Sequence, residues 1–186
     1  MGKFSDVLLT VDYDRTLTAP DSSIPERNLE AIRYFMENDG AFTVNTGRSV
    51  PMIQVFRDRV PVNAPLLLYN GSAAYDLAAE KLLFCHEIRL DLWQTVRECM
   101  TLFPDLTVEV QGLDAHYRFT ENPAWDAFSD HNQCAHGLAR PGDDLGPFLK
   151  FTLYGEFRDV TVASMFDGTP EEVRRMDDAE AQLKAR

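Results

Sequence analysis

Positive charge is scarce in this sequence of 186 residues, which has 18 Lys and Arg against 30 Asp and Glu and a formal net charge of −12. Binding to the phosphate backbone of nucleic acids depends on clustered Lys and Arg. Anionic membrane surfaces attract basic segments for the same electrostatic reason. The composition therefore argues against a nucleic-acid partner and against a membrane partner.

Long apolar runs and paired cysteines are also missing. No apolar run approaches the length of about 20 residues that crosses a membrane, and the first residues lack the apolar core of a signal peptide. Cys85, Cys99 and Cys134 are widely spaced, without a CxxC pattern. This usage favours reduced thiols in a protein core over a disulfide framework, so we expect a cytoplasmic protein.

The first 80 residues alternate between strand and helix signals. Apolar strands are predicted at 7–12, 41–45 and 66–69, with helices between them. Ser23 and Glu26 have the spacing of a capping box, which predicts the start of the first helix. Unbroken apolar strands that alternate with helices are typical of a parallel sheet covered by helices, so an α/β fold is predicted.

Polar residues follow each of these three strands. Asp12 and Asp14 follow the first, residues 45–48 follow the second, and residues 70–71 follow the third. Ligands of parallel sheets bind beyond the carboxyl ends of the strands. Two neighbouring carboxylates repel each other unless a cation or a shared proton offsets the charge. Although such a pair can also simply cap a turn, its position here predicts a binding site.

The chemistry of a carboxylate pair suits phosphoryl transfer. One carboxylate can attack an electrophilic phosphorus and form an aspartyl-phosphate, while its neighbour handles the proton of the leaving group. A hard cation such as Mg²⁺ would hold the pair together and offset the charge of an incoming phosphate.

Three short motifs carry a resemblance to a known family. DYDRTLT at 12–18 resembles the DxDxT signature of the haloacid dehalogenase-like (HAD) phosphohydrolases. TGRS at 46–49 and YNGS at 69–72 resemble the second-strand and third-strand signatures of the Cof-type branch, which includes sugar-phosphate phosphatases. The resemblance implies a Rossmann-like parallel sheet core with an inserted α+β cap domain.

The same resemblance implies roles for individual residues. Asp12 would be the nucleophile and Asp14 the general acid/base, with Mg²⁺ bound by the Asp12 side chain and the Asp14 backbone carbonyl. Thr46 would bind the transferring phosphoryl group. The predicted substrate-binding and phosphate-binding residues are Thr46, Gly47, Arg48 and Asn70. The implied reaction is Mg²⁺-dependent hydrolysis of a small phosphorylated metabolite, with a sugar phosphate expected and transfer to another acceptor left open.

Residues 1–80 would form the N-terminal part of the core and residues 81–186 an incomplete cap. In this second region we expect strands at 81–88, 106–112, 115–120 and 148–155, and helices at 90–103, 123–136 and 169–186. The sequence lacks the C-terminal part of the family's core, which carries a lysine and an acidic loop. Gly142–Asp144 is interpreted as a loop or a helix entry. Lys150 could be the family's lysine, but a structural role on a strand of the cap is favoured.

Two further departures matter. Arg15 stands where the family has glycine in its first motif. The first strand, which is apolar on both faces, would be left at an uncovered edge, so self-association over that edge is expected. The alternative to an active hydrolase is a chain without turnover, either a truncated fragment or a catalytically silent phosphate-binding or assembly module. A metal site at His131, Cys134 and His136 is weighed on their spacing along one helix, and packing roles are favoured.

Overall fold

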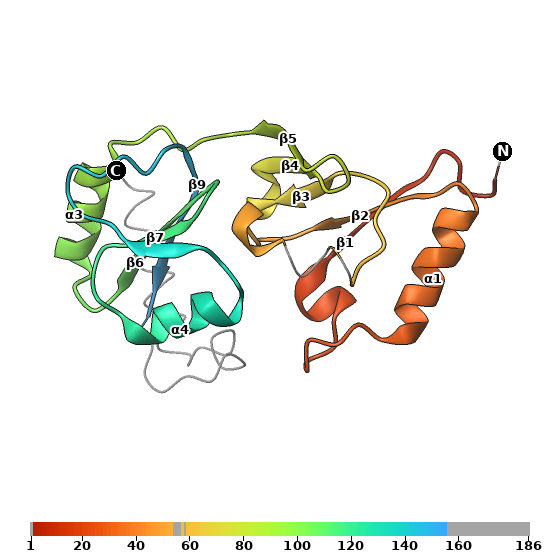
Figure 1. Cartoon of the computed structure of the whole chain (residues 1–186), viewed down its shortest axis with the longest axis horizontal. Coiled ribbons are helices and arrows are strands. Elements are labelled where there is room, and N and C mark those ends of the chain that lie inside the picture. Colours follow the sequence, from red (N-terminus) through yellow and green to blue (C-terminus); the bar gives the residue numbers. More distant parts are fainter. Residues whose placement is uncertain (1, 54–56, 58, 156–186) are drawn as a thin grey trace. The chain divides into compact units, whose positions relative to one another are not determined.

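The computed structural model describes residues 2–53, 57 and 59–155, which form two compact units, Met1–Glu87 and Ile88–Arg186 (Figure 1). The division follows Glu87 and not residue 80, because the strand β5 (Lys81–Cys85) pairs with β4 (Ala73–Asp76) in the first unit. Each unit is described by itself below. The assignment of the units as core and cap stays a prediction.

The first unit contains a five-stranded sheet in the order β1-β2-β3-β4-β5. The first three strands are parallel, as predicted, and the last two add antiparallel hairpins. These parallel strands are β1 (Leu8–Asp12), β2 (Ala41–Asn45) and β3 (Leu66–Leu68). The predicted α/β class, with a partial Rossmann-like sheet, is confirmed.

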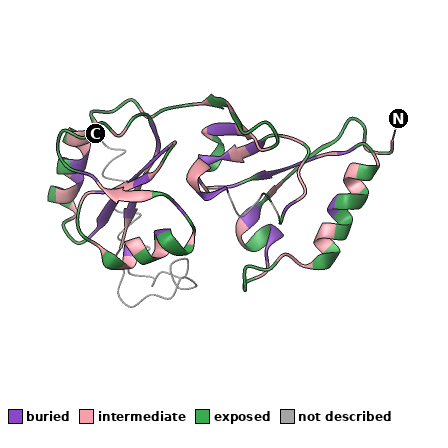
Figure 2. Ribbon diagram, viewed as in Figure 1, coloured by how far each residue is buried: buried purple, intermediate pink, exposed green. Residues whose placement is uncertain are grey.

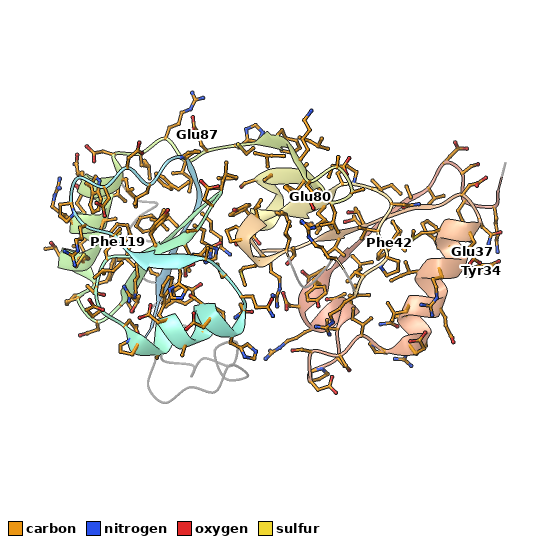
Figure 3. The ribbon with its side chains drawn as sticks, viewed as in Figure 1. Tyr34, Glu37, Phe42, Glu80, Glu87 and Phe119 are labelled. Atoms are coloured by element: carbon orange, nitrogen blue, oxygen red, sulfur yellow. The ribbon has the colours of Figure 1, made fainter. Side chains whose placement is uncertain are left out.

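The interior strands of this sheet carry the core of the unit. Phe42 and Val44 of β2 and Leu66 and Leu68 of β3 are fully buried. The helix α1 (Glu26–Glu37) connects β1 to β2 and contacts β2. Figure 3 shows Phe42 on β2 and the side chains of Tyr34 and Glu37 on α1.

The start of α1 differs from the predicted capping box. Pro25 occupies the N-cap position, and no side chain caps the helix. Ser23 instead donates hydrogen bonds to Asp21 Oδ1 from its backbone N–H at 3.0 Å and from its hydroxyl at 2.6 Å. The Ser23 hydroxyl is thus used in a turn before the helix, and the fixed φ of proline suits the helix entry.

The strand β1 lies at the edge of the sheet and leaves apolar side chains in solvent. Val7, Leu8 and Leu9 are 46%, 61% and 41% exposed, whereas the neighbouring β2 is largely buried (Figure 2). An unpaired apolar edge is a template for pairing with another strand. Among the described strands, β1 pairs with β2 alone, as expected, and self-association over its other edge stays a prediction.

Among its described residues, 88–155, the second unit contains a four-stranded sheet in the order β8-β7-β6-β9 and the helices α3 and α4. The predicted strand pair β6–β7 and the strand β9 are present, and β8 is an element that the sequence analysis missed. The predicted helix 123–136 is shorter, because α4 ends at His131 and Gln133 adopts a positive φ of 53°. The predicted helix 169–186 lies outside the described residues.

The elements of the second unit have the following bounds: α3 (Leu92–Leu102), β6 (Thr107–Gly112), β7 (His116–Arg118), α4 (Pro123–His131), β8 (His136–Leu138) and β9 (Phe148–Tyr154).

The two faces of this second sheet differ in polarity. Val108 and Leu153 pack with Val96 and Cys99 of α3 in an apolar cluster. The opposite face carries Glu109, which is paired with Arg118 of β7 and Thr152 of β9. The fully buried Trp125 of α4 donates a hydrogen bond to the Glu109 carboxylate. None of the described helices has the length and apolar character that a membrane crossing requires.

A pair of leucine variants tests the contrast between the edge and the interior of the first sheet. Leu66→Ala removes a fully buried side chain and should lower the free energy of unfolding by about 2–5 kcal/mol. Leu8→Ala, at the exposed edge, should change it by less than about 0.5 kcal/mol. Urea unfolding followed by circular dichroism measures both. A cost at Leu8 comparable with that at Leu66 would mean that a partner covers the edge in solution.

Candidate functional site

The carboxyl ends of the three parallel strands meet at one edge of the first sheet. Asp12, the last residue of β1, is in register with Asn45, the last residue of β2. The next residue, Thr46, donates its N–H to the carbonyl of Leu67 on β3 at 2.9 Å. The polar residues that follow these strands in the sequence are therefore gathered along this edge.

Hydrogen bonds join the loop after β2 to the loop after β3. Asn70 N–H donates to Thr46 O at 3.0 Å, and Tyr69 N–H donates to Arg48 O at 3.0 Å. The Tyr69 hydroxyl accepts the N–H of Val50 at 3.1 Å. Tyr69, Asn70 and Gly71 all have positive φ, which glycine and asparagine adopt most readily. This tight turn brings the exposed Asn70 to the edge that Asp12 occupies.

Asp12 presents its carboxylate to solvent. Asp12 is an exposed residue, and the Thr16 hydroxyl donates a hydrogen bond to Asp12 Oδ2 at 3.2 Å. Tyr13 and Leu17, on either side of the intervening loop, are buried and anchor the loop to the unit. The carboxylate is therefore reachable by a ligand while its backbone is fixed.

Arg15 takes the conformation that glycine would take at this position. Its φ is 60° and its ψ is 6°, and the residue is exposed. Its N–H donates to the Thr18 hydroxyl oxygen at 3.0 Å, which closes the loop. Arginine thus forms a left-handed turn at this position, and the residue stands at the surface.

Asp14 is paired with Arg48 from the second loop. Arg48 Nε donates to Asp14 Oδ2 at 3.0 Å, and Nη2 donates to Oδ1 at 2.9 Å. The guanidinium also lies over the ring of Tyr13, 5.1 Å from its centroid. This bidentate ion pair offsets the charge of one of the two neighbouring carboxylates.

The remaining predicted residues lie in the same two loops. Thr46 is buried, at 2% exposure, and its Oγ1 accepts the N–H of Arg48 at 3.2 Å. Gly47 is half-buried between them. All six predicted site residues thus lie at or just beyond the strand ends of one unit, with Asp14 and Arg48 in direct side-chain contact. The individual roles of the six residues stay predictions.

The donor set at this edge fits part of a Mg²⁺ site. Mg²⁺ prefers oxygen ligands and commonly uses one or two protein carboxylates together with water and substrate phosphate. The exposed Asp12 carboxylate and the Asp14 carbonyl would supply two oxygens, and the Asp14 carboxylate is engaged by Arg48. Within the described part of the chain, no group of three or more His, Cys, Asp or Glu residues is arranged to hold a metal ion.

The second unit contains a buried carboxylate that the sequence analysis missed. Glu109 is 1% exposed, and its oxygens contact His116 Nδ1 at 2.7 Å, Gln111 Nε2 at 2.9 Å and Trp125 Nε1 at 3.2 Å. Burial acts to raise the pKa of Glu109, but the hydrogen bond and charge of His116, with Trp125, lower it overall. The available signal was a glutamate between two valines, Val108 and Val110, within the predicted strand.

Glu109 also affects its titratable neighbours. Burial and the Glu109 charge raise the pKa of the Cys134 thiol to about 12, which keeps that thiol protonated at neutral pH. Burial raises the pKa of Tyr154 well above its usual value, and Glu109 adds to this. Burial lowers the pKa of Lys150, which Glu109 partly offsets. Cys134 and Tyr154 therefore stay neutral beside the buried Glu109 carboxylate at neutral pH.

The smaller predictions for this unit have mixed outcomes. Asp143 and Asp144 accept backbone N–H groups of Arg140 and Gly146, which confirms the loop interpretation. Lys150 lies on β9, paired with Gln111, as a strand residue of this unit. A shared helix face for His131 and Cys134 is wrong, because α4 ends at His131 and Cys134 follows its last turn.

The fold and this edge together define an α/β protein with a Rossmann-like parallel sheet and an acidic strand-end site. The sequence matches the model of the haloacid dehalogenase-like hydrolase family over residues 9–142. The chain belongs to this family, which confirms the family predicted from its motifs. A search of curated proteins found no match.

Several solved structures share the fold. A haloacid dehalogenase-like hydrolase from Bacteroides thetaiotaomicron aligns with a TM-score of 0.65 at 18% identity, over 83% of this chain and 59% of its own. A protein from Thermotoga maritima aligns with a TM-score of 0.63 at 17% identity, over 95% and 61%. A structure described as a HAD subclass IIB sugar phosphatase aligns with a TM-score of 0.58 at 15% identity, over 71% and 52%. The matched region is therefore about half to three-fifths of the length of these relatives.

Substitutions at Arg15 test the left-handed turn. Arg15→Gly should change the free energy of unfolding by less than about 1 kcal/mol, because relief of the left-handed backbone is offset by greater freedom of the unfolded chain. Arg15→Val should destabilise the protein by about 1–2 kcal/mol, since a β-branched residue fits this conformation poorly. Thermal unfolding compares the two variants. A loss of more than 2 kcal/mol in Arg15→Gly would assign the side chain itself a structural role.

The buried Glu109 predicts a pH-dependent contribution to stability. Glu109→Gln should destabilise the protein by about 1–3 kcal/mol at neutral pH, because the amide has only one acceptor oxygen and a buried donor among Gln111 Nε2 and Trp125 Nε1 loses its acceptor. The folded-state pKa of Glu109 lies below its ordinary value of 4.5, so its contribution is complete above that pH and is lost as the pH falls through the folded-state pKa.

The stability difference between wild type and Glu109→Gln should therefore narrow at acid pH. Urea unfolding at a series of pH values between neutral and 3 measures it. Glu121→Gln is the control, because Glu121 is 77% exposed and its substitution should cost less than about 0.5 kcal/mol. A constant difference across the pH range would contradict the lowered pKa.

Proposed function

We propose that this chain carries the catalytic carboxylates of a Mg²⁺-dependent phosphomonoester hydrolase acting on a small phosphorylated metabolite, through an aspartyl-phosphate intermediate. The observation that carries the proposal is the exposed Asp12 carboxylate at the end of β1, with Asp14 and the Arg48 cation beside it. Membership of a hydrolase family supports it. A sugar phosphate is the proposed substrate class, supported by the sugar phosphatase among the structures that share the fold.

In the proposed first step, an Asp12 carboxylate oxygen attacks the substrate phosphorus. A phosphorus–oxygen bond to Asp12 forms while the bond to the leaving group breaks, and Asp14 donates a proton to the leaving oxygen. Thr46 and Arg48 would bind the phosphoryl oxygens. Mg²⁺, when bound by Asp12 and the Asp14 carbonyl, would offset the negative charge of the phosphate.

In the proposed second step, water cleaves the acyl phosphate. Asp14 takes a proton from the water, the water oxygen bonds to phosphorus, and the bond between phosphorus and Asp12 breaks. Inorganic phosphate and the free Asp12 carboxylate result. Asp14 is returned to its protonated form, so the same group serves as acid in the first step and as base in the second.

A second candidate is a phosphate-binding or assembly module without turnover. It is favoured by the lack, within the described ranges, of a third acidic group beside Asp12 and Asp14. The exposed apolar edge of β1 would suit a module that assembles with a partner. The two candidates differ in one measurable property, the release of phosphate.

Phosphate release from sugar phosphates and p-nitrophenyl phosphate distinguishes the candidates. Asp12→Asn should lower the rate by at least about 10³-fold, because amide nitrogen and oxygen cannot replace the nucleophile. Asp6→Asn is the matched control. Asp6 lies just before the N-terminal end of β1, whereas Asp12 is at its C-terminal end, so the rate should be unaltered. Chelation of Mg²⁺ with EDTA should abolish turnover. The absence of phosphate release from folded protein of confirmed mass would favour the binding module.

A further inference from the structure

Arg48 is held in a fixed position at the carboxyl edge of the first sheet. Its N–H donates to Thr46 Oγ1 at 3.2 Å, and its carbonyl accepts the N–H of Tyr69 at 3.0 Å. Its guanidinium lies 5.1 Å from the centroid of the buried Tyr13 ring, and its side chain is 16% exposed. The cation is therefore preorganised for an anion at this edge.

Asp14 occupies one complete hydrogen-bonding edge of that guanidinium. The Nε and Nη2 groups donate to separate Asp14 oxygens at 3.0 and 2.9 Å. This two-pronged geometry is also the one in which arginine binds phosphate. A phosphate that binds the same edge must displace the carboxylate.

The pair is placed where it can be broken. Asp14 is 38% exposed, so water can solvate its carboxylate when the pair opens. Exposed ion pairs change an equilibrium constant by less than about tenfold. An incoming phosphate dianion carries more charge than one carboxylate and can therefore compete for the cation.

We propose that Asp14 and the substrate phosphate compete for the Nε–Nη2 edge of Arg48, so that phosphate binding releases Asp14. The inference rests on the proposed function, in which Asp14 serves the leaving group. While it is paired, both Asp14 oxygens are directed at Arg48. When phosphate takes the guanidinium, Asp14 becomes able to turn toward the leaving oxygen, which couples occupation of the site to placement of the acid/base group.

The alternative is that Asp14 permanently braces Arg48 for phosphate binding. The two interpretations predict opposite effects of Asp14→Asn on affinity for inorganic phosphate. Competition predicts tighter binding, because a neutral amide yields the guanidinium more easily. Bracing predicts weaker binding, because the guanidinium loses its partner.

Isothermal titration calorimetry of inorganic phosphate into the full chain, with Mg²⁺ present, separates the two interpretations. Asp14→Asn should tighten phosphate binding about two- to fivefold. In the Arg48→Ala background the same change should give a smaller gain. An equal or larger gain without Arg48 would show plain charge repulsion and overturn the proposal, as would weaker binding in Asp14→Asn or binding by none of the variants. Asp6→Asn controls for the removal of one distant negative charge.

A second measurement follows the Arg48 side chain directly and begins with the unaltered protein. The NMR signal of the Arg48 Nε–H, assigned by its loss in Arg48→Lys, should shift on phosphate addition and should be already displaced in phosphate-free Asp14→Asn. A signal that does not move at saturating phosphate would overturn the proposal. Neither measurement requires turnover, so a failed hydrolysis assay would remove the proposed reaction, whereas only these two measurements decide the proposed competition.

Discussion

Negative charge at the carboxyl edge of the first sheet is the constraint that the other features of the site depend on. A chain with a net charge of −12 ends β1 with two carboxylates one residue apart. Arg48 offsets the charge of Asp14 through a bidentate pair, while Asp12 remains exposed. The two acids therefore have different environments, which is the condition for giving two carboxylates different roles.

The strand that carries Asp12 is also the least protected strand of its sheet. Its apolar side chains at Leu8 and Leu9 are exposed, yet β2 beside it is buried. The position of Asp12 is fixed by backbone pairing to Asn45 and by the buried Tyr13 and Leu17 in the following loop. Backbone pairing and these two anchors therefore maintain the site edge even though the other side of the strand is open.

In the second unit, the feature that depends on electrostatics is a buried carboxylate. Glu109 lies in the interior of the unit, where its charge is satisfied by His116, Gln111 and Trp125. Gln111 lies on the same strand as Glu109, whereas His116 comes from β7 and Trp125 from α4, so both of those elements must be correctly docked for the carboxylate to be stabilised. A buried charge of this kind stabilises the one packing of β6, β7 and α4 in which its hydrogen bonds form, and it destabilises packings that leave it unpaired.

The sequence by itself determined the family, the parallel strands and the six residues at their ends, because strand periodicity and the Asp12–Asp14 motif are local patterns. It could not give the Asp14–Arg48 pair, which joins residues 34 positions apart, or the partners of Glu109. It also extended α4 beyond His131, where Asn132 caps the helix and Gln133 adopts a positive φ. Tertiary structure decided the Asp14–Arg48 pair and the partners of Glu109, because these depend on strand register and on which loops meet in space.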